Sequence, residues 1–302
     1  MKSSTPGLPT RLYPSADSVR PVRWGSGPVA FELRSPDEDI LDEARRVFSP
    51  WRPSADADVV ESYDAQWTDD EIVVKPRPPL PDGSKHKKIT HVGHAVAVVE
   101  YAAIWQIVEA CTHLLSFHAA LLHRAGKSVA VVGPSHSGKS TLAAGLWQSG
   151  WEFLCDDLTI VASGRTAIPG PRRVSLRHES KPLLGEALWR SITDTKGYFK
   201  HEHGWLFQPM HIDGGAPGKV DLSAVFFLKR NGAAACTKPE RLTPAHAALA
   251  LLPYTNFVRK RSFPSALAPV AELMAETPAW DLPRAELPSM VGAVNRLVGL
   301  EQ

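Results

Sequence analysis

The stretch from Lys127 to Asp157, KSVAVVGPSHSGKSTLAAGLWQSGWEFLCDD, is better suited to handling a phosphorylated ligand than any other part of the chain. Its loop fits the pattern G-x-x-x-x-G-K-[ST]. The residues expected to surround the phosphates of ATP are Gly133, Pro134, Ser135, His136, Ser137, Gly138, Lys139, Ser140 and Thr141. Glycines let phosphate oxygens approach the backbone N–H groups closely, and the N-terminus of the following helix attracts the anion. We expect Lys139 to reach the β- and γ-phosphates and the Ser140 hydroxyl to ligate Mg²⁺.

An acidic pair, Asp156 and Asp157, follows one short helix after this loop. The pair ends a strand-like run, and carboxylates at the carboxyl end of a strand beside a phosphate loop can handle Mg²⁺ and the attacking group. Asp156 is the expected metal ligand together with Ser140. Each carboxylate raises the pKa of the other, whereas Mg²⁺ and Lys139 lower both, so the net direction stays open. A solvated acidic turn is the alternative interpretation.

Short apolar segments are expected to hold these groups in place. The run Val129–Val132 is typical of a buried strand, and a helix follows the loop until Gly150 ends it. Trp151–Cys155 and Leu158–Val161 are further expected strands. The run Leu222–Leu228 is expected to be a central strand that is buried on both faces. The alternative for the loop itself, a chance match in a Gly/Ser turn, is disfavoured by the strand before it and the helix after it.

Upstream of the loop, the segment Phe117–His123 is expected to be a strand, and it carries His118. The order of His118, phosphate loop, one helix and Asp156–Asp157 resembles the HPr kinase family, with the same spacings and no gap. The resemblance covers roughly residues 118 to 161. It implies a P-loop kinase core of the HPr kinase/PEP carboxykinase type, in which Lys139 and Ser140 hold the donor phosphates. It also implies that Asp157 takes the proton from a substrate serine and that His118 lies close to Asp157.

The chain also departs from that family. The Gly-Arg-Asn signature of its phosphorylase members is absent downstream of the acidic pair, and Thr141 stands where those members are expected to carry an acid. The chain therefore looks more like the divergent relatives that phosphorylate precursor peptides, as in lasso peptide clusters. This resemblance implies an ATP- and Mg²⁺-dependent serine kinase with a protein or peptide acceptor. The alternatives are a P-loop small-molecule kinase or regulator, and a nucleotide-binding scaffold without catalysis.

Arginines follow the acidic pair in the segment Arg172-Arg173-Val-Ser-Leu-Arg177, where basic and apolar residues alternate. Either they form the exposed face of a strand, or they anchor a nucleotide phosphate or an acidic peptide through the guanidinium fork. Arg177 is the strongest candidate for nucleotide binding. A phosphate contact by Lys196 or Lys200 is a weaker possibility, because lysines in a polar segment usually face solvent. A metal site at His201, His203 and His211 is also weaker, because the spacing of these histidines fits no zinc signature.

Composition limits the other functions. The net charge of +2 is typical of neither a nucleic-acid-binding nor a strongly acidic protein, and the basic run Lys85–Lys88 is interpreted as solvated surface. Three widely spaced cysteines (Cys111, Cys155 and Cys236) frame no disulfides, which favours a reducing cytoplasm. The N-terminus has no signal-peptide core, and no membrane span is expected. The sequence leaves open whether identical chains associate into a homo-oligomer.

We expect an α/β protein with a mixed sheet and a small additional module. Residues 1–25 are rich in proline and serine and are interpreted as a flexible arm. Residues 26–115 are predicted to form a small N-terminal α/β module, closed by a helix from Val96 to about His113. Residues 116–302 are predicted to form the P-loop domain. No linker marks the boundary between the last two regions.

Overall fold

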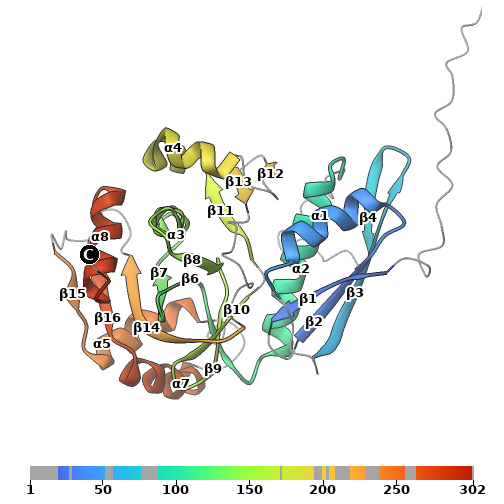
Figure 1. The fold of residues 1–302 in the computed structure, drawn as a ribbon. Helices are drawn as coiled ribbons and strands as arrows, with labels where there is room; N and C mark the ends of the chain where they lie inside the picture. Colours follow the sequence, from blue (N-terminus) through green and yellow to red (C-terminus); the bar gives the residue numbers. More distant parts are fainter. Residues whose placement is uncertain are drawn as a thin grey trace, which may run out of the picture.

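The computed structural model describes residues 20–26, 29–51, 57–75, 88–170, 172–193, 199–201, 204–207, 218–228, 238–255 and 263–300. Helices and strands alternate irregularly along this part of the chain, and its sheets include both parallel and antiparallel pairs (Figure 1). The mixed α/β class predicted from the sequence is therefore confirmed. Within the described residues, no helix is both long enough and apolar enough to cross a membrane.

The N-terminal part of the chain forms a four-stranded sheet with two helices. The elements are β1 (Val22–Ser26), β2 (Val29–Arg34), α1 (Glu38–Phe48), β3 (Asp58–Thr68), β4 (Glu71–Lys75) and α2 (Val92–Ala110). The strand order is β1-β2-β3-β4, with β2 and β3 parallel. The prediction of a flexible arm to residue 25 was wrong for its last part, because Val22–Ser26 pairs with β2. Its Trp24 is fully buried and stacks on Phe48, with ring centroids 4.2 Å apart.

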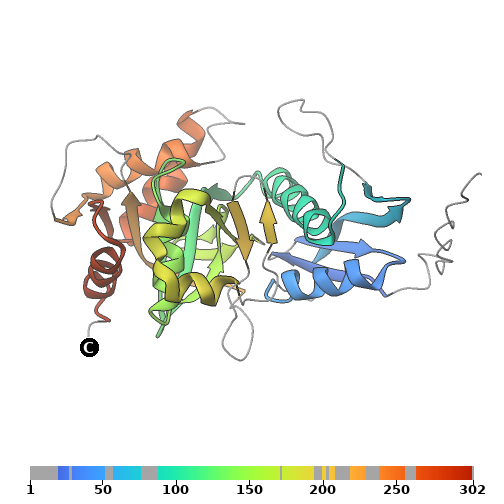
Figure 2. The same cartoon turned by 90° about the horizontal axis from the view of Figure 1, so that it is seen from above.

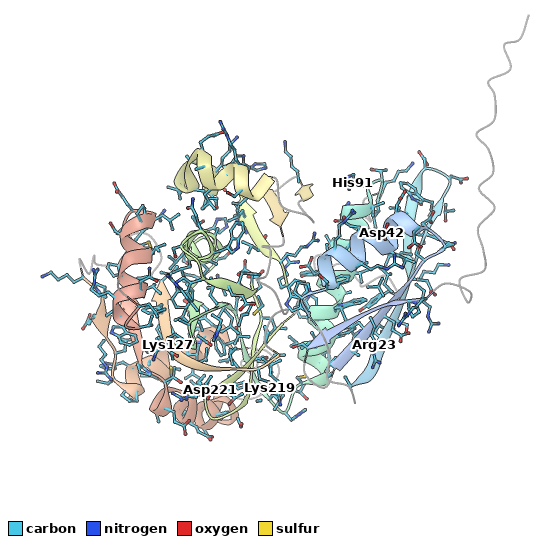
Figure 3. All side chains as sticks on the ribbon, in the orientation of Figure 1. Arg23, Asp42, His91, Lys127, Lys219 and Asp221 are labelled. Atoms are coloured by element: carbon cyan, nitrogen blue, oxygen red, sulfur yellow. The ribbon has the colours of Figure 1, made fainter. Side chains whose placement is uncertain are left out.

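A larger mixed sheet forms the body of the molecule, with the order β5-β9-β10-β14-β7-β6-β8 and β16 beside β14. Its strands are β5 (Leu115–Phe117), β6 (Ala119–Arg124), β7 (Lys127–Val132), β8 (Glu152–Cys155), β9 (Thr159–Ser163), β10 (Thr166–Pro169), β14 (Val220–Leu228), β15 (Glu240–Arg241) and β16 (Ala279–Leu282). As predicted, β14 is central. The structure adds that β7 and β16 run parallel to it. In Figure 3, Lys127 and Asp221 lie at the end of the sheet where the strands β7 and β14 begin. The phosphate loop therefore follows the opposite, C-terminal end of β7.

Both faces of β7 are covered by helices, and its side chains alternate between them. Val129 and Val131 pack in a cluster with α3 (Lys139–Gln148) and α8 (Leu287–Leu297). Ala130 and Val132 pack with α5 (Pro244–Leu251) and α7 (Phe263–Glu276). A strand that is apolar on both faces belongs in the interior of such a layered sheet. This burial fixes the position at which the chain leaves β7 and enters the loop.

The remaining elements form a small antiparallel sheet with the order β11-β13-β12, and α4 follows β11 in the chain. The bounds are β11 (Val174–Arg177), α4 (Lys181–Thr193), β12 (Phe199–His201) and β13 (Gly204–Phe207). The polar composition of residues 194–211 indicates a loop, whereas the described residues of that segment form two strands. Pairing with β11 explains the difference, because an isolated short strand has no local signal strong enough to be recognised.

The N-terminal part packs directly against the larger sheet. Figures 1 and 2 both show α2 on the side that faces the rest of the chain. Residues of α2, among them Val96, Val99 and Ala103, share one buried cluster with Leu158 and Ile160. The sequence predicted a boundary near residue 115, and β5 begins there. The apolar contacts across that boundary are continuous within the described residues.

Candidate active site

The phosphate loop joins the buried end of β7 to the first turn of α3. Gly138 is the N-cap of α3 and has φ of +98°, a conformation that favours glycine. Lys139 is buried, and its Nζ donates a hydrogen bond to the carbonyl oxygen of Gly133 at 3.0 Å. Burial lowers the pKa of Lys139, and the charges of Asp156 and Asp157 oppose that shift. The ammonium is therefore held inside the curve of the loop.

Two features of the loop leave room and a free polar atom for a ligand. A Cβ on Gly133 would lie 2.7 Å from the backbone oxygen of Leu228 and 2.7 Å from Ser137 Oγ, so only glycine fits there. A Cβ on Gly138 would meet nothing within 4 Å, so the space beside this residue is open. The hydroxyl of Ser137 is buried and has no hydrogen-bond partner among the described residues. Such an unpaired polar atom is costly unless a ligand or water satisfies it.

Asp156 is fully buried beneath the loop and is surrounded by donors. Its Oδ2 accepts hydrogen bonds from Ser140 Oγ at 2.6 Å and from the backbone N–H of Ser175 at 3.2 Å. Its Oδ1 accepts the backbone N–H of Asp157 at 3.0 Å. Burial, and then the charge of Asp157, raises the pKa of Asp156 to about 6, against the opposing effects of Ser140 and Lys139. The sequence left open whether the pKa of Asp156 is raised or lowered, and in the structure it is raised.

Asp157 faces the cavity and contacts His118. Asp157 Oδ1 lies 2.5 Å from His118 Nε2, and its backbone has a φ of +62°, which aspartate tolerates better than most residues. Burial raises the pKa of Asp157, but the hydrogen bond with His118 and the charges of Arg172, His118 and Lys139 outweigh it. The net pKa is far below the usual value for aspartate. The Asp157 carboxylate is therefore ionised at neutral pH.

His118 is positioned by a break that the sequence did not reveal. The predicted continuous strand from Phe117 to His123 is two strands, because β5 ends at Phe117 and β6 begins at Ala119. β5 pairs with β9, whereas β6 pairs with β7 and β8. Between them, the backbone N–H of His118 donates to the carbonyl of Tyr254 at 2.9 Å. The change of partner strand frees the imidazole to turn towards Asp157.

A cavity of about 380 Å³ opens over these groups. Its predicted lining residues are His118, Ser135, His136, Ser137, Gly138, Lys139, Ser140, Thr141, Asp157 and Arg177. Gly133, Pro134 and Asp156 lie behind this lining; Gly133 and Pro134 offer their carbonyl oxygens to Lys139, and Asp156 is held by Ser140. The cavity is also lined by residues that sequence reasoning did not select, namely Ser175, Glu179, Ser180, Leu183 and Arg284. Arg284 follows β16 in an exposed segment and carries no local motif that could have indicated it.

The interpretation of the arginine segment as one exposed strand face was wrong for two of its members. Arg173 is fully buried and forms an ion pair with Glu100, and Arg172 is largely buried beside Asp157. Arg177 is exposed and lines the cavity, where its charge lowers the pKa of Lys139. No motif in the sequence indicated that Glu100, in the helix α2, would face this segment.

Several weaker expectations fall partly outside the described residues. Lys196, His203, His211, Cys236 and the run from Lys85 to Lys87 lie there. In the part of the chain that the structure describes, no three His, Cys, Asp or Glu side chains are grouped to hold a metal on their own. The magnesium site predicted at Ser140 and Asp156 differs from such a site, because substrate phosphates and water complete the coordination of Mg²⁺ in kinases.

No protein-family model matches the chain, and no curated protein matches it. Among solved structures, the chain is similar to the Hpr(Ser) kinase/phosphatase from Coxiella burnetii, with 13% sequence identity and a TM-score of 0.34. The match covers 61% of this chain and 96% of the other. Similarity at this level carries no conclusion about activity.

Proposed function

We propose that the chain is an ATP- and Mg²⁺-dependent kinase that phosphorylates a serine of a protein or peptide. The observation that supports this proposal most is the position of Asp157. Its carboxylate lines the same cavity as Lys139 and the phosphate loop, and it forms a hydrogen bond with His118. A polyphosphate and an acceptor hydroxyl could therefore meet beside one ionised carboxylate.

The loop fits the phosphates of ATP. It offers an open space at Gly138, a buried ammonium at Lys139 and, at Ser137, a buried hydroxyl that no described residue pairs with. The cavity volume of about 380 Å³ lies within the range of small-ligand sites. Exposed Arg177 and Arg284 add positive charge to its lining. Polyphosphate is the ligand class that this combination favours, because it needs charge neutralisation and many N–H donors.

The pair Ser140 and Asp156 fits Mg²⁺. Their oxygens lie 2.6 Å apart and are hard donors, which magnesium prefers. When bound, Mg²⁺ would neutralise charge on the transferred phosphoryl group. Because Asp156 has a raised pKa, it must lose a proton before it ligates the cation, so we expect metal affinity to fall below about pH 6.

In the proposed reaction the protein itself forms no covalent bond to the substrate. The acceptor Oγ–P bond forms while the bond from the γ-phosphorus to the bridging β–γ oxygen breaks, and ADP leaves. Asp157 accepts the proton of the serine hydroxyl. Its low pKa keeps it ionised but makes it a weak base, so it orients the hydroxyl through a hydrogen bond and receives the proton only as the Oγ–P bond forms. His118 holds the orientation of this carboxylate. Lys139 stabilises negative charge on the phosphates. The protein thus supplies position and charge rather than a covalent intermediate.

The proposal is tested by incubating the purified chain with radiolabelled ATP, Mg²⁺ and three peptide libraries. The libraries differ only in a central serine, threonine or alanine. We expect label in the serine library, as phosphoserine, with loss of labelling in Asp157→Asn. Exclusive transfer to small metabolites would support a small-molecule kinase instead. Binding of ATP without any turnover would support a nucleotide-sensing scaffold.

A further inference from the structure

The acidic pair Asp156–Asp157 is in contact with a cluster of largely buried charged residues, Arg172, Arg173 and Glu100. Glu100 belongs to the N-terminal part of the chain. Glu100 projects from α2 and is fully buried, as is Arg173. Glu100 Oε1 accepts the backbone N–H of Arg173 at 2.6 Å, and Glu100 Oε2 accepts Arg173 Nε at 2.9 Å. Arg173 Nη2 lies 2.8 Å from the same oxygen. Backbone and side chain of one arginine are thus bound by a single carboxylate.

The segment that Glu100 binds is also the segment that contacts both aspartates. The carbonyl of Arg172 accepts the backbone N–H of Asp156 at 3.1 Å. The backbone N–H of Ser175 donates to Asp156 Oδ2. Arg172 Nε lies 3.7 Å from Asp157 Oδ2, and Arg172 Nη1 lies 3.9 Å from Glu100 Oε1. Residues 172–175 therefore form a bridge from α2 to the two carboxylates.

We infer that Glu100 is a positioning residue for Asp156 and Asp157, and that α2, which carries Glu100, contributes to the geometry of the active site. Glu100 lines no part of the cavity, so it acts only through residues 172–175. It fixes the backbone at Arg173 and keeps the Arg172 guanidinium between two carboxylates. This inference rests on the proposed function for its kinetic consequences, but its structural consequence can be measured without any turnover.

The physical argument is the cost of burying charge. A buried guanidinium is tolerated only when it is paired, and removal of one partner leaves the other uncompensated. In Glu100→Gln, an amide N–H₂ or a single neutral oxygen faces the Arg173 donors, so the 172–175 segment loses its anionic anchor and is expected to shift. Displacement of about 1 Å at a reacting group can lower a rate about 100-fold. Nucleotide binding should persist, because no atom of the phosphate loop contacts Glu100 among the described hydrogen bonds and ion pairs.

The first test is amide hydrogen exchange of the full chain without ligand, in the parent and in Glu100→Gln. We expect about 10-fold faster exchange at the amides of Arg173 and Ser175, which donate to carboxylates, and at the amide of Asp156, which donates to the carbonyl of Arg172. The amide of Leu142, which bonds to Gly138 in α3, should be unchanged. The control is Glu43→Gln, the same substitution at a buried glutamate of α1 that pairs with Arg46. Unchanged exchange at the three amides would overturn the inference.

The second test separates positioning from stability. Glu100→Gln should lower kcat for labelling of the serine library about 10- to 100-fold with unchanged Kd for ATP. In an Asp157→Asn background it should lower kcat by a smaller factor than in the parent, since one of the two positioned carboxylates is already disabled. A loss by the same factor as in the parent would mean a general structural role and would contradict the inference. If the parent itself transfers no phosphate, the proposed function fails, and hydrogen exchange alone decides the role of Glu100.

A third variant covers the case in which Glu100→Gln does not fold. Glu100→Leu combined with Arg173→Met replaces the buried pair by apolar side chains, which buried cores often accept. We expect this double variant to fold and bind ATP but to keep the low kcat, because residues 172–175 have lost their anchor. Recovery of the parental kcat together with the fold would overturn the inference.

Discussion

The hydroxyl of Ser140 donates a hydrogen bond of 2.6 Å to Asp156 Oδ2, which joins the first turn of α3 to the strand end beyond that helix. Asp156 is fully buried at this contact, and its pKa is raised to about 6, mainly by burial. A carboxyl group in this state destabilises the fold when it is ionised. The feature that suits Asp156 to a cation therefore costs the ligand-free protein stability at neutral pH.

Asp156→Asn is predicted to be tolerated better by the ligand-free protein at pH 7 than at pH 4. The folded pKa exceeds the unfolded one, 3.8, so stability from this group is fully present below pH 3.8 and is lost as the pH rises through about 6. Between pH 4 and pH 7 the free energy of unfolding of the variant relative to the parent should rise by on the order of 2–3 kcal/mol. A cost that does not depend on pH is added, because the asparagine N–H₂ group meets the donors of Ser140, Ser175 or Asp157. Urea unfolding in EDTA between pH 4 and 7.5 measures this difference. Parallel pH profiles for variant and parent would contradict the raised pKa.

His118→Gln is predicted to lower the rate of phosphoryl transfer about 10-fold without changing ATP affinity. The imidazole touches Asp157 and no atom of the phosphate loop within the described hydrogen bonds. Single-turnover transfer and fluorescent-nucleotide binding measure the two effects separately. His123→Gln is the matched control, since His123 is at the other end of β6 and bonds to Ser128. Weaker ATP binding in His118→Gln would show that the contact supports the loop instead.

Gly133→Ala is predicted to lower the free energy of unfolding by about 1–3 kcal/mol, the usual cost of overpacking. Its new Cβ would lie 2.7 Å from the backbone oxygen of Leu228, which cannot move as a side chain could. The matched control is Gly292→Ala in α8, where nothing lies within 4 Å of the added atom. There the same change should be neutral or stabilising. Equal stability of the two variants in chemical denaturation would refute the packing argument.

The local part of this arrangement could be predicted from the sequence. The strand, loop and helix around Lys139 follow from an apolar run and a fixed motif, and the N-cap at Thr243 follows from its Thr-Pro pair. The structure has both, with Thr243 Oγ1 accepting the backbone N–H of His246. Such features depend on residues within a few positions of one another. For the same reason, the acidic pair could be placed at a strand end.

The remainder depends on contacts between distant segments. Glu100 and Arg173 are 73 positions apart, and in the sequence each looks like a charge interrupting an apolar pattern. His118 turns towards Asp157 only because β5 and β6 pair with different strands. Arg284 reaches the cavity because β16 pairs with β14. None of these pairings has a local signal. The closeness of His118 to Asp157 was predicted only through the family resemblance, and the contacts of Glu100 and Arg284 were not predicted at all.

The central claim is a division of labour between Lys139, which holds the nucleotide, and Asp157, which receives the acceptor proton. The most direct test measures the Kd for ATP and the rate of transfer to serine peptides in Asp157→Asn and Lys139→Ala. Asparagine suits the left-handed backbone at residue 157, so that variant should fold normally. We predict that Asp157→Asn loses about 100-fold or more in transfer rate with unchanged Kd, whereas Lys139→Ala loses both. Equal loss of ATP affinity in the two variants would contradict the account.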